Sequence, residues 1–240
     1  MAWESPLTID AAVRSLPTGE LQDLPDGATV SVLEAAQKMI AISDNTATDL
    51  LIRALGRDAV LAAMLEMGHG DPALNTPLLT TREYFWLGWG DADLRERWAA
   101  GDTAERTALL ADVPAGVPDT DDVDWSVPAW ESGVDWFATP ADVARAHTAL
   151  QEKATTSAGA PLREILSANP GAAMGPAWTY VGFKGGSAAG VLAGTWYLER
   201  NDGTPVILTL LARSSDHTVF ADPTAIYAHA QDAARLLEAG

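Results

Sequence analysis

The stretch that decides the fold class is Thr179–Arg213, TYVGFKGGSAAGVLAGTWYLERNDGTPVILTLLAR. Its segments 179–184, 191–200 and 205–213 are rich in β-branched and aromatic residues, which is typical of strands. Asn201-Asp202-Gly203 has the composition of a hairpin turn and joins the last two segments. The stretch therefore predicts three strands in an antiparallel sheet.

Helical patterns fill most of the chain before these strands. Ser31 and Glu34 have the spacing of a capping box and open a predicted helix. Helices are predicted over 32–41, 47–55, 58–67, 81–90, 91–111, 140–153 and 161–168, and a last one from Asp222 to about Glu238. Residues 1–29 and 112–135 are rich in Pro and Asp and are expected to be mostly loop. This order favours an α+β fold in a single domain over 1–240.

The composition limits the classes of partner. The chain has 33 Asp and Glu against 15 Lys and Arg, a formal charge of -18. Such a surface repels phosphate backbones and anionic lipid, so neither nucleic acid nor a membrane is expected as a partner. Because the chain has no cysteine, disulfides and thiolate catalysis are excluded. The four histidines lack the spacing of metal ligands, so no metal site and no cofactor are expected.

No apolar run is long enough for a transmembrane helix, and the first residues do not form a signal peptide. The localisation is therefore cytoplasmic by default, and the protein would be exported if a preceding segment carried a signal.

The sharpest local motif is Ser43-Asp44-Asn45-Thr46-Ala47, between two predicted helices. It matches S-D-N, a motif of class A β-lactamases and penicillin-binding proteins. Ser, Asp and Asn are also preferred helix caps, so a helix N-terminus alone would explain the three letters. Asp44 is interpreted as a buried structural carboxylate.

A second motif is Phe183-Lys184-Gly185-Gly186-Ser187, at the end of a predicted strand. It resembles the K-T-G strand motif of the same proteins, with Gly185 in place of Thr. By itself, Lys184 would be read as a solvated lysine. It follows S-D-N in the right order, however, and precedes two more strands and a terminal helix.

Together these motifs make the chain resemble class A β-lactamases and penicillin-binding proteins, closely over 29–56 and 178–240 and loosely between. The resemblance implies a β-lactamase-like fold and acyl-enzyme hydrolysis of small β-lactam-like amides or esters. It implies that Ser43 relays protons and that Lys184 holds the substrate carboxylate. Asn45, Gly185, Gly186 and Ser187 would bind substrate, and a monomer is expected. The long separation of the motifs suggests an insertion within 84–136.

One family motif is missing. No serine in the chain is followed three residues later by lysine, so the S-x-x-K nucleophile is absent, and only 42 residues precede Ser43. We therefore expect a chain truncated at its N-terminus, which lacks the first strands and the nucleophile helix and is inactive as given. The edge of strand 205–213 would then be open, which predicts poor stability. No P-E-x-L-N loop is found either, and Glu83 and Glu131 are interpreted as solvated carboxylates.

Two alternatives stay open from the sequence. One is a non-catalytic β-lactamase-fold binding module or pseudoenzyme, and the other is an unrelated acidic α+β domain in which Ser43-Asp44-Asn45 is only a cap. An in-frame S-x-x-K upstream of Met1 would favour the enzyme, whereas a stop codon close upstream would favour the module. The sequence does not identify the substrate, and whether the chain is an enzyme stays open.

Overall fold

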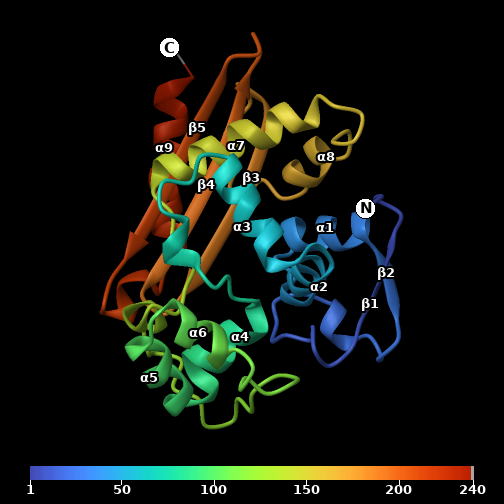
Figure 1. Cartoon of the computed structure of the whole chain (residues 1–240). Coiled ribbons are helices and arrows are strands. Elements are labelled where there is room, and N and C mark those ends of the chain that lie inside the picture. The colour runs from blue at the N-terminus through green and yellow to red at the C-terminus, as the bar shows by residue number, and fades with distance from the viewer. Residues whose placement is uncertain (239–240) are drawn as a thin grey trace. The chain divides into compact units, whose positions relative to one another are not determined.

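The computed structural model describes residues 1–238, which have the α+β composition that the sequence predicts (Figure 1). The chain forms two compact units. The first comprises Met1–Glu66 and Asp71–Phe137, and the second comprises Met67–Gly70 and the chain from Ala138 onward. That they make up one domain stays a prediction.

The first unit is mainly helical and carries a small antiparallel pair of strands that the sequence did not predict. Its strands are β1 (Pro6–Thr8) and β2 (Thr29–Ser31). Its helices are α1 (Val32–Ala41), α2 (Asn45–Leu55), α3 (Arg57–Glu66), α4 (Thr81–Phe85), α5 (Ala92–Ala100) and α6 (Thr103–Leu109). Short 3-10 turns are η1 (Leu21–Asp23), η2 (Pro72–Asn75) and η4 (Ala129–Ser132), and η3 (Trp86–Gly90) is a π-helical turn.

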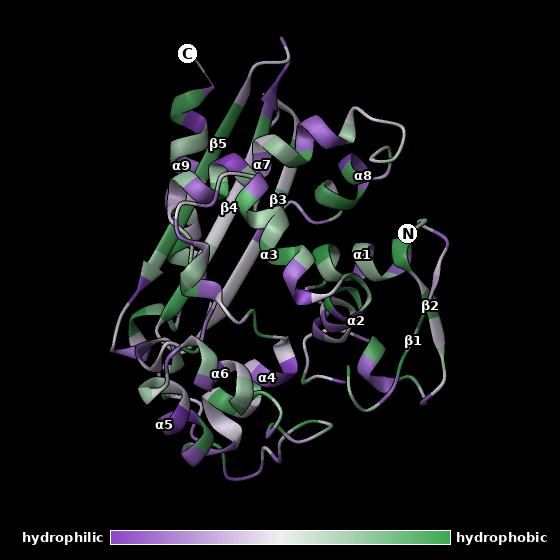
Figure 2. Ribbon diagram, viewed as in Figure 1, coloured by the Kyte–Doolittle hydropathy of each residue, from purple (hydrophilic) through white to green (hydrophobic). Residues whose placement is uncertain are grey.

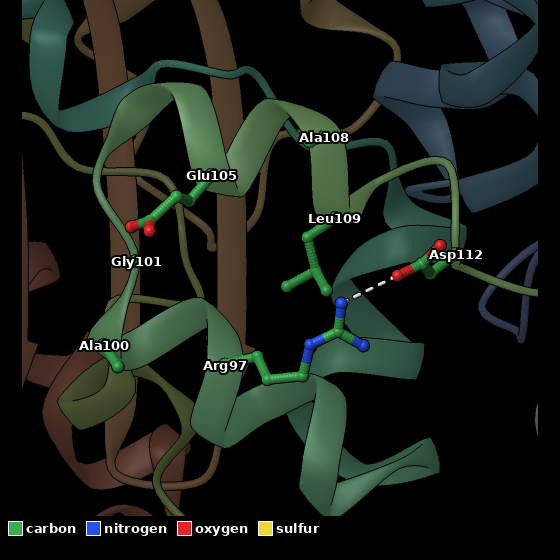
Figure 3. Close-up of a pocket in the computed structure, with 7 residues that line it drawn as sticks. All are labelled: Arg97, Ala100, Gly101, Glu105, Ala108, Leu109 and Asp112. Atoms are coloured by element: carbon green, nitrogen blue, oxygen red, sulfur yellow. Dashed lines mark hydrogen bonds and ion pairs between the residues drawn. The ribbon is translucent and has the colours of Figure 1, made fainter.

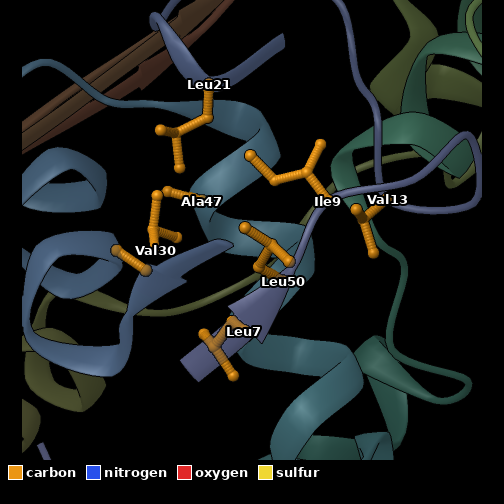
Figure 4. Close-up of a cluster of buried hydrophobic side chains, with 8 residues drawn as sticks. Leu7, Ile9, Val13, Leu21, Val30, Ala47 and Leu50 are labelled. Atoms are coloured by element: carbon orange, nitrogen blue, oxygen red, sulfur yellow. The ribbon is translucent and has the colours of Figure 1, made fainter. Parts of the chain in front are cut away.

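The N-terminal part of this unit is held together by an apolar cluster. Figure 4 shows side chains of the first 30 residues meeting Ala47 and Leu50 of α2. The cluster is completely buried at Ile9 and Ala47. Strands of three residues leave too little alternation to be recognised, so the sequence predicted loop here. Burial against α2 is what orders this segment.

Residues 112–135 are loop apart from the turn η4, close to the prediction, and tryptophan side chains attach this loop to the helices. Trp86 Nε1 donates to the carbonyl of Gly116 at 2.9 Å, and Trp98 Nε1 donates to that of Gly133 at 3.0 Å. Trp89 Nε1 donates to the carbonyl of Val127 at 3.1 Å. Backbone carbonyls of a loop without regular structure therefore obtain hydrogen-bond donors from tryptophan side chains.

The second unit is a three-stranded antiparallel sheet with helices on both faces (Figure 1). The strands β3 (Trp178–Ala188), β4 (Val191–Arg200) and β5 (Pro205–Arg213) lie in that order, which confirms the predicted sheet. The helices are α7 (Pro140–Ala154), α8 (Leu162–Ser167) and α9 (Pro223–Leu237), with the 3-10 turn η5 (His217–Phe220). β5 is an edge strand among the described residues, and Figure 2 shows it mostly in the hydrophobic colour.

Alternation along β4 separates the two faces of this sheet. Trp196 and Leu198 are completely buried against Ala230 and Ala234 of α9. Thr195, the residue before Trp196, points to the opposite face and bonds to His147 of α7.

The strand that carries Lys184 is longer than predicted. The sequence ended it at Lys184, but β3 continues to Ala188, and Gly185 and Gly186 pair with Gly194 and Ala193 of β4. The low strand propensity of glycine hid this continuation. The predicted motif thus lies inside a strand and not at its end.

Candidate active site

The Ser43-Asp44-Asn45 motif forms the turn between α1 and α2. Ser43 has a φ of 56° and is the single non-glycine residue with positive φ among residues 1–238. The Thr18 hydroxyl donates to the carbonyl of Ser43 at 2.7 Å, and the Asn45 N–H donates to the carbonyl of Thr18 at 3.0 Å. Left-handed backbone at a residue with a side chain is unfavourable, so it persists only where the surroundings enforce it.

Asp44 is the residue through which this turn is fixed, and its predicted structural role is confirmed. It is completely buried and caps α2 by accepting the N–H of Ala47 at 2.8 Å. Its other oxygen accepts the N–H groups of Glu20 and Leu21 at 2.7 and 3.0 Å. A Cβ at Gly19 would come within 2.4 Å of this carboxyl group, so only glycine fits there. Asp44 therefore joins residues 19–21 to the start of α2.

Asn45 is the first residue of α2 and is partly exposed. Its side-chain amide donates to the carbonyl of Leu16 at 2.9 Å. Ser43 and Asn45 are thus held from the same side, by the segment that runs from Leu16 to Leu21. Sequence analysis read that segment as an ordinary loop and missed its role.

Lys38 is a residue near the motif that sequence analysis did not select. Its carbonyl accepts the N–H groups of Ile42 and Asp44, and its ammonium contacts the Glu20 carboxylate at 2.7 Å. This contact with Glu20 raises the pKa of Lys38. Lys38 lies in the last turn of α1, outside the Ser43-Asp44-Asn45 motif, so the motif did not select it. Its contact with Glu20 is seen only in the fold.

The second predicted group lies in the other unit, on β3. Lys184 is half-buried, and burial lowers the pKa of its ammonium. Its Nζ donates to the carbonyl of Gly185 at 2.7 Å. Across the ladder Lys184 pairs with Thr195, whose hydroxyl donates to the Lys184 carbonyl at 3.3 Å. A partly desolvated ammonium on a rigid strand is suited to binding a carboxylate.

The glycine at position 185 has a steric cause. A Cβ there would lie 2.7 Å from Cζ of Phe183 and 3.2 Å from the hydroxyl of Tyr227. A threonine at this position, as in K-T-G, would therefore collide with the packing between β3 and α9. Gly186 has open space around it, and both Gly186 and Ser187 are exposed.

His147 of α7 contacts β4 at Thr195, the residue paired with Lys184, on the face opposite α9. Its Nε2 lies 2.9 Å from the Thr195 hydroxyl, while its Nδ1 is buried without a hydrogen-bond partner. A second proton would be placed on that unpartnered atom, and burial lowers the pKa of His147. The imidazole ring of His147 therefore stays neutral near pH 7. Sequence analysis did not select His147 as a site residue.

Of the two glutamates considered as a base, one was interpreted wrongly. Glu83 is 2% exposed, not solvated, because its carboxylate forms a bidentate pair with Arg57 at 2.6 and 2.8 Å. It also closes a capping box with Thr80. The sequence could not show this, since the partner arginine is 26 positions away. Glu131 is exposed, as predicted.

The structure thus brings Ser43 and Asn45 together in the first unit and Lys184, Gly185, Gly186 and Ser187 together in the second. A pocket of about 530 Å³ in the first unit contains none of them (Figure 3). Its Arg97 is neutralised by Asp112 at 2.8 Å, as the dashed line in Figure 3 shows.

Within residues 1–238, no His, Asp and Glu side chains gather in a group that could hold a metal ion. None of the helices described there is long and apolar enough to cross a membrane.

Comparisons with known proteins bear on the fold and the family. The sequence model of the family described as "Beta-lactamase enzyme family" matches residues 1–239. No curated protein matches the chain at a significant level. A β-lactamase from Sphaerobacter thermophilus is 21% identical, with a TM-score of 0.56, over 90% of this chain and 68% of its own. A β-lactamase from Chitinophaga pinensis is 14% identical, with a TM-score of 0.54, over 89% of this chain and 68% of its own.

A protein named PBP-A is 17% identical, with a TM-score of 0.57, over 90% of this chain and 64% of its own. A variant of PBP-A has been solved as an acyl-enzyme complex with penicillin G. The chain thus spans about two thirds of the length of these solved proteins. At such identities the likeness shows the fold, which is the predicted β-lactamase-like α+β fold.

Proposed function

The chain belongs to the β-lactamase enzyme family, and on that basis we propose that it carries two elements of an acyl-enzyme serine hydrolase. One is a proton-relay turn with Ser43 and Asn45. The other is a carboxylate-binding strand with Lys184 and the backbone of Gly185-Gly186-Ser187. The substrate class is small amides or esters of the β-lactam type.

The observation that carries this proposal is the conformation of Ser43. The N-terminal cap of α2 is Asp44, so Ser43 is not needed for that role. Ser43 follows the C-cap of α1, where a left-handed residue is common but is usually glycine or asparagine, whereas here it is a serine. Strained backbone at a polar residue is typical of a functional site. The acyl-enzyme formed by a PBP-A variant supports the reaction class by analogy with that protein.

In the proposed roles, the Ser43 hydroxyl passes a proton to the leaving nitrogen, and the Asn45 amide hydrogen-bonds to the substrate. The partly desolvated ammonium of Lys184 attracts the substrate carboxylate. None of these groups is a nucleophile activated by a base. The bond-breaking step needs such a nucleophile, and the sequence has no S-x-x-K to provide it.

We therefore expect that no serine of these 240 residues is acylated. After incubation with a fluorescent penicillin, the protein should run unlabelled on a denaturing gel and keep its intact mass. A Ser43→Ala variant is the control and should behave identically. Label that survives denaturation and maps to a serine of this chain would contradict this expectation.

Non-covalent binding tests the role of Lys184. The protein has three lysines, so isotopic labelling of lysine side chains gives three resolvable ammonium signals. Titration with benzylpenicillin should shift the Lys184 signal, because the ligand carboxylate adds a negative charge beside a half-buried ammonium. Lys184→Ala should weaken binding at least tenfold, on the order of one charge-assisted hydrogen bond.

Lys153→Ala is the matched control and should bind like the parent. An unshifted Lys184 signal at saturating ligand, or equal shifts at all three lysines, would show that Lys184 does not bind the ligand carboxylate. The second candidate function is a non-catalytic binding module. It predicts binding of this ligand class through Lys184 without covalent labelling under any condition.

A further inference from the structure

Aromatic side chains from α4, η3 and the loop 112–136 form a continuous run in the first unit. The ring centroids of Tyr84 and Trp136 are 4.8 Å apart, and those of Tyr84 and Trp89 are 5.2 Å apart. Trp89 continues the run to Trp125 at 5.5 Å, and Phe85 joins Trp125 at 6.3 Å. The run connects the helical segment 84–89 with the loop 112–136. We call these five side chains the aromatic run.

Two indoles at the ends of this run are open to solvent. Trp125 is 45% exposed and Trp136 is 40% exposed, although large aromatic side chains are mostly buried in folded proteins. Trp136 is also fixed in orientation, because its Nε1 donates to the carbonyl of Leu79 at 3.2 Å. A rigid exposed indole offers a face for stacking at little cost in conformational entropy.

The loop around these indoles is strongly acidic. No lysine or arginine lies between Arg106 and Arg145, whereas seven carboxylates do so within 112–135 alone. Asp119, Asp121 and Asp122 are exposed a few residues before Trp125. The surface therefore combines negative charge with exposed π faces.

The same chain shows what such indoles attract. The guanidinium of Arg106 lies over the ring of Trp98, 5.2 Å from the centroid. Within residues 1–238, no cationic side chain covers the rings of Trp125 or Trp136 in this way. Their π faces are therefore available to a cation from another molecule.

We propose that the aromatic run and the acidic loop 112–135 bind an arginine-rich segment of a partner polypeptide. Guanidinium fits this surface better than ammonium, because its plane stacks on an indole while its N–H groups reach neighbouring carboxylates. The proposal uses neither Ser43 nor Lys184, so it stands or fails independently of the proposed catalytic family role.

A blocked peptide of alternating arginine and glycine is the probe, with tryptophan emission and calorimetry as readouts. The parent protein should bind it at low salt and more weakly at physiological salt, as expected for partly screened charges. A lysine–glycine peptide of the same length should bind several-fold more weakly. Replacing both exposed indoles by leucine keeps apolar area but removes the π faces. The Trp125→Leu, Trp136→Leu double variant should lose about tenfold in affinity.

Charge is tested with two triple variants that change net charge equally. The loop variant is Asp119→Asn, Asp121→Asn, Asp122→Asn, and the control neutralises exposed carboxylates outside the loop: Asp23→Asn, Glu96→Gln, Glu152→Gln. The loop variant should weaken arginine-peptide binding clearly more than the control. Circular dichroism of each variant shows whether its fold is retained.

Three outcomes would overturn the proposal. They are no binding at low salt, equal losses in the two triple variants, and unchanged affinity in the folded double tryptophan variant. The last two would mean that the peptide responds only to the overall charge of -18.

Discussion

Asp44→Ala is expected to lower the free energy of unfolding by about 4 kcal/mol, because it removes a cap and leaves buried N–H groups unpaired. The carboxylate accepts three N–H groups, those of Glu20, Leu21 and Ala47. Leu21 and Ala47 are almost completely buried, so water cannot replace the lost acceptor. Thermal denaturation should show a fall in Tm of roughly 10 °C for a chain of this size.

Two variants calibrate this effect. Asp44→Asn keeps one acceptor oxygen and should lose about half as much stability. Asp222 caps α9 through a single bond to the Thr224 N–H, in an exposed position. Asp222→Ala should therefore cost about 1 kcal/mol or less. Equal losses in Asp44→Ala and Asp222→Ala would show that Asp44 is an ordinary cap and does not fix the turn.

The second large effect concerns Asp49, a buried carboxyl group in α2. Burial raises the pKa of Asp49 to about 7, against the partial offset of three hydrogen bonds from Thr81 and Arg82. Between about pH 4 and 7 the folded protein keeps a proton that the unfolded chain releases. Stability is therefore expected to fall as pH rises through this window, by about 4 kcal/mol for this group, and to level off above it.

The measurement is the difference between the parent protein and Asp49→Asn as a function of pH. Asparagine does not ionise, so the variant should lack this component, and the stability of the parent relative to the variant should fall between pH 4 and 7. Because burial also raises the pKa of Asp135 to about 6, only the difference isolates Asp49. A carboxyl carbon signal of Asp49 that titrates near pH 4 would show that the three donors outweigh burial.

Much of the fold could be predicted because its signals are local. The β-branched and aromatic residues of Val191–Arg200 and Pro205–Arg213 predicted both strands with the bounds that the structure has. The capping pair Ser31 and Glu34 likewise marked the start of α1, where the Glu34 N–H donates to the Ser31 hydroxyl. Such patterns need no information from distant residues.

Errors arose where distant contacts decide. Glu83 looked like a solvated side chain because Arg57 belongs to a different helix. A different kind of error is the predicted helix over 91–111, which is two helices because Asp102 forms a capping box with Glu105 and starts α6 anew. That signal is local and was overlooked in the sequence. The short pairing of β1 with β2 depends on burial against α2, which no three-residue pattern reveals.

For the candidate site, the motifs selected Ser43, Asn45 and Lys184, and their roles stay predictions. What the sequence could not supply is the surrounding support. The contact of Lys38 with Glu20 spans 18 positions, and that of His147 with Thr195 spans 48. These partners have no fixed spacing, so only the three-dimensional structure identifies them.

The glycine at position 185 also bears on how this sequence can change. The ring of Phe183 lies between Gly171 and Gly185, and a Cβ at either glycine would come within 2.7 Å of it. The ring is also confined by Trp196, with centroids 4.9 Å apart. The Phe183 ring therefore has no free space to move into when a side chain is added at position 185. An evolutionary path from K-G-G to K-T-G must first shrink Phe183, so these positions are expected to be epistatic and to change in a fixed order.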